Sequence, residues 1–499
     1  MRTLALALSL LALTLSANYT FGARKGTNYY VDSVNGKDSN TGTSPDKAFK
    51  SLSRAGDIKL APGDSLLFKR NCSFNGTIKI SAKGTPDNRI TIGSYGDGET
   101  ACLSAPDGSA YTFYILNSDY LTVENLEIVN TGSKALAKRT GVLLECANKG
   151  VSHGITLNSL YVHDVNGVLT KKDGGGSGIL VKNWWEPNKQ PSSFDGLLIE
   201  NCVVRRCERN GIVWSSAWNR KNWFPSKNVV VRGNLIEGVP GDGILMMGCD
   251  GAIIEYNLMR DCPGTLPAGE VAVGMWPWSC DNTTIRFNEV GDHKAPWDGQ
   301  AFDSDYNCRN THIEYNYGYN NDGGFLLVCN YGGDTTDNIG NIGTVARYNI
   351  SYGDGVRNFK TPSGWYSPTV RIGGPCEDTL IENNIFFVTS KPSSEIDRHV
   401  IKSDSWEGYA DKTTFRKNVF FTEQKSAFDL TKSTNNVFDK NYFYGKYKNK
   451  PKGKKGGSSV KKLKKLIPTL LTQKPIANGK AILTTVDKEA IEKYFKKLK

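Results

Sequence analysis

Two carboxylates stand two residues apart in mid-chain, at Asp303 and Asp305 in the stretch AFDSDYNC. Side chains two apart in a β-strand lie on the same face, with their backbones about 6.6 Å apart. Glycoside hydrolysis needs two carboxyl groups, about 5 to 5.5 Å apart for retention or about 6.5 to 9.5 Å for inversion, so this spacing serves either outcome. Repulsion between the two charges would also raise the pKa of one carboxyl and give an acid beside a base.

A repeated phrase shows what kind of strand carries this pair. A short β-rich segment ending in Asn recurs at intervals of 23 to 35 residues, and a second strand precedes it in each unit. This pattern predicts an all-β fold, a right-handed parallel β-helix of about ten or eleven coils. Stacked coils would place the Asn side chains above one another, as a ladder that satisfies turn backbone groups. The members are Asn201, Asn234, Asn257, Asn288, Asn316, Asn349, Asn384, Asn418 and Asn441, with weaker ones at Asn125 and Asn158.

The cysteines follow the same repeat. Five of the 11 close the first strand of successive coils, so they should stack at the inter-strand spacing of about 4.8 Å. That separation permits one or two disulfides, which remain an open alternative, but the chain contains no CxxC motif. We therefore expect a buried thiol stack and no metal site. The five are Cys249, Cys280, Cys308, Cys329 and Cys376.

The ends of the chain differ from the repeats. Residues 1–23 combine Arg2, an apolar run and small residues, which predicts a signal peptide and a secreted, periplasmic or cell-surface protein without a membrane span. Residues 24–66 should form an N-terminal cap with a short amphipathic helix starting at Ser44, and 67–447 the β-helix. Residues 448–499 should form a Lys-rich linker and a terminal helix. The net charge of +12 lies in this tail, which suits either an anionic glycan or plain solvation.

Alternation along the strands predicts a carbohydrate cleft around the Asp pair. Trp276 and Trp278 share the outward face with it, unless the register slips by one and inverts every assignment. Asp322 is a third catalytic candidate, whereas the Asp-Gly pairs at Asp242, Asp298 and Asp354 indicate turns, with Asp298 and Asp322 the most plausible exceptions. The predicted substrate-binding residues are Trp276, Trp278, His293, Trp297, Arg371, Lys402 and Trp406.

Two longer segments carry a family resemblance. The opening YYVDSVNGKDSNTGTSPDKAFKSL, the run of Asn-ending strands and GQAFDSDYNCRNTHIEYNYGYNNDGGF resemble secreted right-handed β-helix carbohydrate-active enzymes over residues 28 to 445. The second segment is similar to β-helix glycoside hydrolases of the β-xylosidase and the xylanase and α-L-fucosidase groups. This resemblance implies a catalytic role for Asp303 or Asp305. In the β-xylosidase relatives the acid stands on the following coil, where this chain has GGFLLVC, so the acid would be the other Asp of the pair, Asp322 or a loop residue.

Together these features predict a monomeric glycoside hydrolase that cleaves a plant or algal polysaccharide or oligosaccharide without a cofactor or metal, and that binds no nucleic acid. Two alternatives stay open. A polysaccharide lyase would hold Ca²⁺ with the acidic pair while Lys182, Arg371 or Lys402 removes a proton. A non-catalytic solenoid would bind glycan without turnover, and fold alone does not decide among the three.

Overall fold

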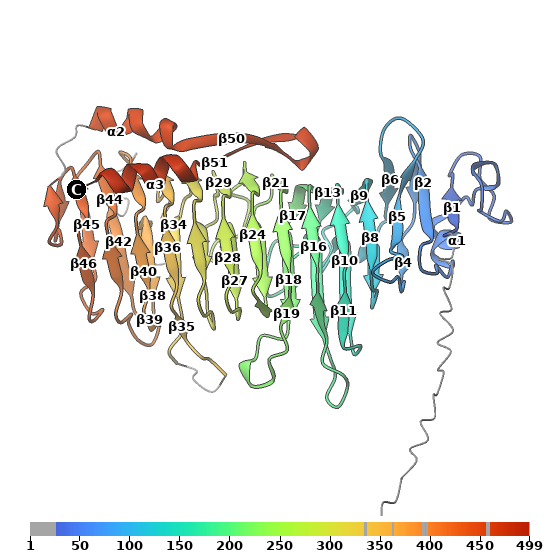
Figure 1. Cartoon of the computed structure of the whole chain (residues 1–499), viewed down its shortest axis with the longest axis horizontal. Helices are drawn as coiled ribbons and strands as arrows, with labels where there is room; N and C mark the ends of the chain where they lie inside the picture. Colours follow the sequence, from blue (N-terminus) through green and yellow to red (C-terminus); the bar gives the residue numbers. More distant parts are fainter. Residues whose placement is uncertain are drawn as a thin grey trace, which may run out of the picture.

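The computed structural model describes residues 26–333, 337–361, 364–391, 395, 398–455 and 460–498, so the predicted signal peptide lies outside the described residues. The fold is the predicted right-handed parallel β-helix. Three long parallel sheets run along the stack, two of 14 strands and one of 13 (Figure 1). These are more coils than the ten or eleven expected, because the first coils lack the Asn phrase. Within the described residues, no helix has the length and apolar character to cross a membrane.

The 13-stranded sheet, which we call the site sheet, carries the Asp pair. One 14-stranded sheet runs from β1 (Asn28–Val31) to β46 (Val437–Asp439), and the other from β3 (Ser73–Asn75) to β49 (Lys454–Lys455). The site sheet consists of β4 (Ile78–Ile80), β7 (Tyr111–Leu116), β10 (Thr140–Ala147), β14 (Ser177–Trp184), β18 (Asn210–Ser216), β22 (Ile244–Met247), β27 (Met275–Trp278), β31 (Gln300–Ser304), β34 (Gly324–Cys329), β38 (Val370–Gly373), β42 (His399–Asp404), β45 (Ser426–Asp429) and β48 (Tyr447–Lys448).

The asparagine ladder is confirmed from Asn234 onward. In a typical step the backbone N–H and the Nδ2 of Asn257 both donate to Oδ1 of Asn288, at 2.9 and 3.0 Å. The same pattern continues through the buried residues of the following coils to Asn441. Asn201 was wrongly included: it lies one residue before the ladder position, with φ 55°, and the N–H of Cys202 donates to Asn234 instead.

Replacing one amide of this ladder should be costly. Asn288→Ala removes the acceptor for two donors of Asn257 and the donor to the carbonyl of Ile254 (2.9 Å), all of them buried. Each buried group left without a partner costs about 1–3 kcal/mol, so we expect a loss of about 3 kcal/mol or more in the free energy of unfolding. Urea denaturation measures it. Asn158→Ala, outside the ladder and only half-buried, is the control and should cost about 1 kcal/mol or less.

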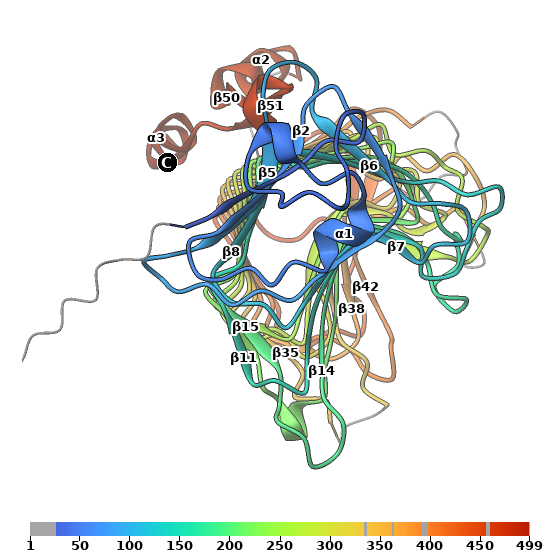
Figure 2. The ribbon, with the colours of Figure 1, turned by 90° about the vertical axis from the view of Figure 1, so that its right-hand side faces the viewer.

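The N-terminal cap differs in detail from the expected helix. A 3₁₀ turn, η1 (Pro45–Lys47), follows Ser44, and the α-helix α1 (Leu52–Gly56) starts later, where Ser51 accepts from the N–H of Arg54 at 3.1 Å. The chain between them is extended, which lets Phe49 bury its ring while Leu52 and Ala55 also face the core, as predicted. Seen along the axis, α1 lies across the end of the stack (Figure 2).

Four of the five predicted cysteines form the buried stack. The backbone N–H of Cys249 donates to the sulfur of Cys280 at 3.3 Å, and all 11 cysteines, each within the described residues, are free thiols. The residues that directly follow the stack positions pair from coil to coil in the order Asp250, Asp281, Arg309, Ile342 and Glu377. The residue before Ile342 is Asn341, so Asn341 occupies the fourth level of the stack, between Cys308 and Cys376. The prediction was therefore wrong for Cys329, which lies on β34 and faces outward.

The C-terminal segment is not a solvated tail. Residues 460–498, which we call the brace, form α2 (Val460–Leu466), η3 (Ile467–Leu470), the hairpin of β50 (Leu471–Ile476) and β51 (Ala481–Val486) around η4 (Ala477–Gly479), and α3 (Lys488–Lys497). The brace doubles back along the stack, away from β38 and β42 (Figures 1 and 2). Its apolar side chains pack on outward residues of many coils, including the ring column Tyr256, Phe287, Tyr315 and Tyr348. The linker prediction is wrong for these residues, and the terminal helix is α3.

A buried carboxyl under the brace should make stability depend on pH. Glu289 accepts a hydrogen bond from the N–H of Thr484, and burial raises its pKa from 4.5 to about 7. Because the folded state favours protonated Glu289, the raised pKa of this group stabilises the fold fully below pH 4.5. That stabilisation is lost as the pH rises to 7, where the folded protein must also give up the proton. Glu289→Gln should therefore match the wild type at pH 4 and exceed its unfolding free energy by up to about 3 kcal/mol at pH 8. Equal differences at both pH values in thermal unfolding would refute this.

Candidate active site

The outer face of the site sheet is as predicted around the Asp pair. Met275 pairs with Phe302 in the core, and Leu245 pairs with Trp276 on the outer face, where both line a groove. The outward row continues from Asp303 through Leu327, Arg371 and Lys402, which pair in that order. On β34 the expected outward residues Leu326 and Val328 belong to the core instead, because Phe302 pairs with Leu326.

Asp303 and Asp305 lie together with Cys329, and one ligand atom of each lies within 4.8 Å of the others. Asp305 is partly exposed, but Asp303 is only 1% exposed. The expectation that both project into water is therefore wrong for Asp303. Asp303 is on the outer face and is nevertheless buried, with the sulfur of Cys329 on the next coil 3.9 Å from its Oδ1.

Burial controls the protonation of this pair. Burial, followed by the charges of Asp305 and Asp298, raises the pKa of Asp303 well above its usual range. Burial also raises the pKa of Asp305 to about 6. The Cys329 thiol (3.1 Å) and the Tyr306 N–H (2.6 Å) both donate to its carboxylate, and these hydrogen bonds lower the pKa and so limit the rise. Burial thus favours the uncharged form of Asp303, while Asp305, with a pKa of about 6, titrates near the pH at which general acid–base groups work best.

Asp298 is a third carboxyl of the same cluster. It precedes Gly299 with φ 54°, as the turn interpretation predicted, yet its carboxylate accepts from Nη1 of Arg371 at 3.0 Å and its side chain is 15% exposed. Burial raises its pKa, and the Arg371 guanidinium works against that rise. Its charge acts on both Asp303 and Asp305. Of the three carboxyls that act on one another here, Asp298 and Asp305 are therefore partly accessible, and only Asp303, on β31, is covered.

Arg371 organises the far side of this cluster. Its Nε donates to Asp404 at 3.1 Å, and its guanidinium lies 5.4, 5.0 and 4.8 Å from the ring centroids of Trp297, Tyr366 and Trp406. The ammonium of Lys402 lies 4.8 Å from the Tyr366 ring. These residues line a hollow of about 280 Å³, so the structure brings together four of the predicted binding residues. Tyr366 was missed, because its loop position carries no periodic signal, whereas Asp404 is the last residue of β42, where strand alternation places it on the same face as Lys402.

The near side of the cluster is aromatic. Trp276 stacks on Trp278 at 6.5 Å between centroids, and Trp278 stacks on Trp218 at 5.9 Å. A groove of about 500 Å³ begins at Trp276 and Trp278 and runs back over the site sheet to Tyr111 on β7. A smaller hollow of about 250 Å³ lies between Trp218, Trp278 and Tyr306. Such faces suit the C–H surfaces of sugars.

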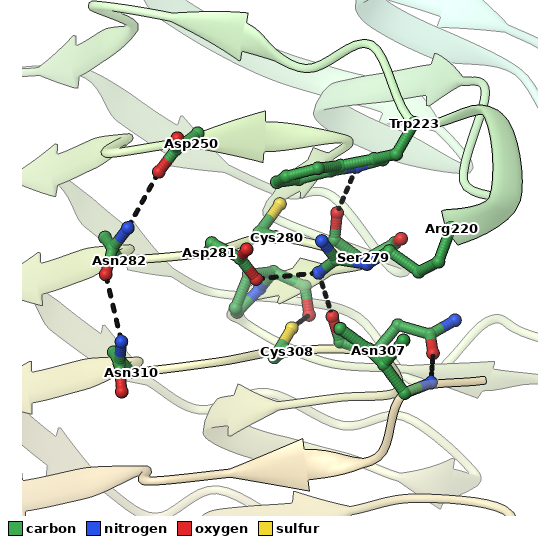
Figure 3. A network of polar contacts seen from close by, with 12 residues as sticks. Arg220, Trp223, Asp250, Ser279, Cys280, Asp281, Asn282, Asn307, Cys308 and Asn310 are labelled. Atoms are coloured by element: carbon green, nitrogen blue, oxygen red, sulfur yellow. Dashed lines mark hydrogen bonds and ion pairs between the residues drawn. The ribbon is translucent and has the colours of Figure 1, made fainter.

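The loop that carries Trp218 is anchored to the coils by a polar network (Figure 3). Arg220 donates to Asp281 at 2.9 Å and to the carbonyl of Asn307, and the indole N–H of Trp223 donates to the carbonyl of Ser279 at 3.2 Å. The hydroxyl of Ser279 in turn donates to the carbonyl of Trp218 at 2.5 Å. The exposed indole of Trp218 is therefore held in place beside Trp278.

Two predicted site residues lie elsewhere. His293 is fully buried, one ring nitrogen lies 3.1 Å from the carbonyl of Gly241, and burial lowers its pKa to about 4, so the prediction that it binds substrate from a surface loop is wrong. Asp322 is buried at a coil corner, where it accepts from Lys294 at 3.2 Å. Asp242 and Asp354 have turn roles, since Asp242 pairs with Arg209 (2.8 Å) and Asp354 accepts from Asn321 (2.8 Å).

Asp303, Asp305 and Cys329 form the one group of three potential metal ligands found in the described part of the chain. Ca²⁺ takes oxygen ligands, often six to eight, whereas a thiol suits softer metals. This donor set does not fit Ca²⁺, which the lyase alternative would place at the acidic pair.

Comparisons with known proteins agree with the fold. Residues 177–342 match the family described as "Right handed beta helix region". The chain is 28% identical to the lacto-N-biosidase of Bifidobacterium longum subsp. longum over 81% of its own length, and it spans 32% of that protein. The crystal structure of the GH136 lacto-N-biosidase from Eubacterium ramulus superposes with a TM-score of 0.60 at 23% identity, covering 85% of this chain and 68% of that one. The predicted resemblance to β-helix carbohydrate-active enzymes is confirmed.

Proposed function

We propose that this protein is a glycoside hydrolase in which Asp298 and Asp305 supply the two carboxyl groups. The observation that carries the proposal is the placement of these two accessible carboxyls between two hollows lined by aromatic side chains. Asp298 accepts a hydrogen bond from Arg371, and Asp305 has a pKa of about 6. One carboxyl donates a proton to the leaving oxygen while the other, ionised, acts as nucleophile or base. Asp303 lies beside Asp305 but is buried, and we assign it no direct contact with the substrate.

The substrate we propose to test first is an oligosaccharide ending in lacto-N-biose, because the relatives are named lacto-N-biosidases. Plant or algal glycans, predicted from the sequence, form the second group. The proposed reaction uses no cofactor or metal, and we further propose that the protein is exported and acts as a monomer.

The test is to incubate purified protein with neutral, sulfated and uronic glycans and to measure new reducing ends and ultraviolet absorbance. Hydrolysis gives reducing ends without a new double bond and continues in the presence of a chelator. Absorbance that rises with cleavage and disappears with chelation would show a lyase instead. Binding without cleavage of any glycan would show the non-catalytic solenoid.

A further inference from the structure

The groove beside Trp276 and Trp278 differs from the other hollows in its charge. It passes over six consecutive strands of the site sheet, from β7 to β27, a path of about 24 Å at the inter-strand spacing. Its charged lining residues are Lys138, Lys171, Lys182 and Asp242. Because β31 follows β27 directly, one end of the groove meets the carboxyl cluster.

The ammonium groups are at the surface of this groove and their counter-charges are beneath it. The side chains of Lys171 and Lys182 are 41% and 39% exposed, whereas their partners Asp242 (3.4 Å) and Glu145 (3.0 Å) are 2% and 9% exposed. Asp242 is also neutralised by buried Arg209 at 2.8 Å. A ligand in the groove therefore meets the cations before the carboxylates.

Lys138 and Lys171 stand on adjacent loops that are bonded to each other. The backbone N–H of Lys138 donates to the carbonyl of Gly174 at 2.6 Å, and the N–H of Gly174 donates to the carbonyl of Lys171 at 3.0 Å. Lys171 also reaches the aromatic end of the groove, with its ammonium 5.3 Å from the Trp276 ring. The fold thus holds two exposed cations on one side of a groove with aromatic residues at its end.

We propose that this groove binds an anionic group, a carboxylate or a sulfate, carried by the glycan on the side of the cleaved bond that faces β27. This inference rests on the proposed function and narrows it to acidic glycans. Lys138 and Lys171 bind the anion by charge-assisted hydrogen bonds, while the indoles seat a neighbouring sugar ring. Lys182 adds positive charge further along the groove.

Calorimetric titration tests the subsite apart from catalysis. The probes are a neutral tetrasaccharide ending in lacto-N-biose and the same tetrasaccharide bearing one carboxylated sugar or one sulfate, each titrated into Asp305→Asn protein. At low salt at least one acidic probe should bind about tenfold more tightly than the neutral one, and the difference should shrink at high salt. Which acidic probe binds more tightly identifies the group. Equal affinity for all three probes would overturn the proposal.

Matched lysines on the same two loops separate a subsite from general surface charge. Lys138→Ala and Lys171→Ala should each weaken binding of the acidic probe about tenfold and change the neutral probe less than twofold. Lys134→Ala and Lys172→Ala, exposed neighbours outside the groove, should change neither. Equal losses in all four variants would overturn the subsite. Selective acidic binding without hydrolysis by the wild type would refute only the proposed function, and hydrolysis without acidic preference only the subsite.

Discussion

Asp298→Asn and Asp305→Asn should each lower the rate of glycan hydrolysis about a thousandfold, whereas Asp303→Asn should keep it within about tenfold of the wild type. The first two substitutions remove a carboxyl that substrate can reach. The third replaces a buried carboxyl whose pKa burial raises well above its usual range, so that the folded protein favours its uncharged form, which an amide resembles. An amide of nearly the same shape fits that place without leaving a charge unpaired. Initial rates on the best substrate of the glycan panel give the three values.

The Asp303 variant decides between two carboxyl pairs. If Asp303→Asn is as inactive as Asp305→Asn while Asp298→Asn stays active, Asp303 and Asp305 are the two catalytic carboxyls and the assignment of Asp298 is wrong. Asp322→Asn is a matched control, since Asp322 is also buried and pairs with Lys294 at the coil corner; it should stay active. Thermal unfolding of each variant shows whether lost activity reflects lost structure.

Phe495→Ala should lower the free energy of unfolding by about 3–5 kcal/mol, as for a phenylalanine removed from a packed core. Phe495 lies on α3 of the brace, is 4% exposed and packs against the ring of Tyr348 at 6.1 Å between centroids. Its truncation leaves a cavity between the brace and the coils. Urea denaturation measures the loss, and activity under native conditions should be unchanged because the brace lies away from the site sheet.

Lys493→Ala on the same helix is exposed and provides the control, with an expected change within about 0.5 kcal/mol. If Phe495→Ala proves equally neutral, the last helix does not stay docked in solution, and the solvated tail expected from the sequence would be the better description.

The repetitive part of the molecule could be predicted from the sequence, because each coil repeats the same physical demand. A buried turn needs an amide at Asn257 or Asn316, and the two-residue period of a strand sets Trp276 and Phe302 on opposite faces. The failures have local causes. Cys329 is the last residue of its strand, whereas the other four cysteines stand beyond a turn, so similar spacing hid a different face.

The site was harder to predict, because its residues meet through loops. Asp298 is a turn residue, as its sequence context indicates. Its place in the carboxyl cluster could be seen only in the structure, where Arg371, 73 positions later in the chain, lies beside it. The brace was hidden by its lysines. Their charges indicated solvent, while the intervening Leu463, Ile467, Ile491 and Phe495 supply the apolar face that packs on the coils.

The brace also bears on the order in which the protein can mature. The amide of Asn478 bonds to Ser159, which lies 319 positions earlier in the chain, whereas most coil contacts join residues only one repeat apart. A growing chain can therefore stack its coils as they emerge from the ribosome, whereas this contact waits until Asn478 has also emerged. Until then the ring column under the brace is bare and open to association with other chains. Docking of the brace would therefore end the interval in which this ring column is exposed in each newly made molecule.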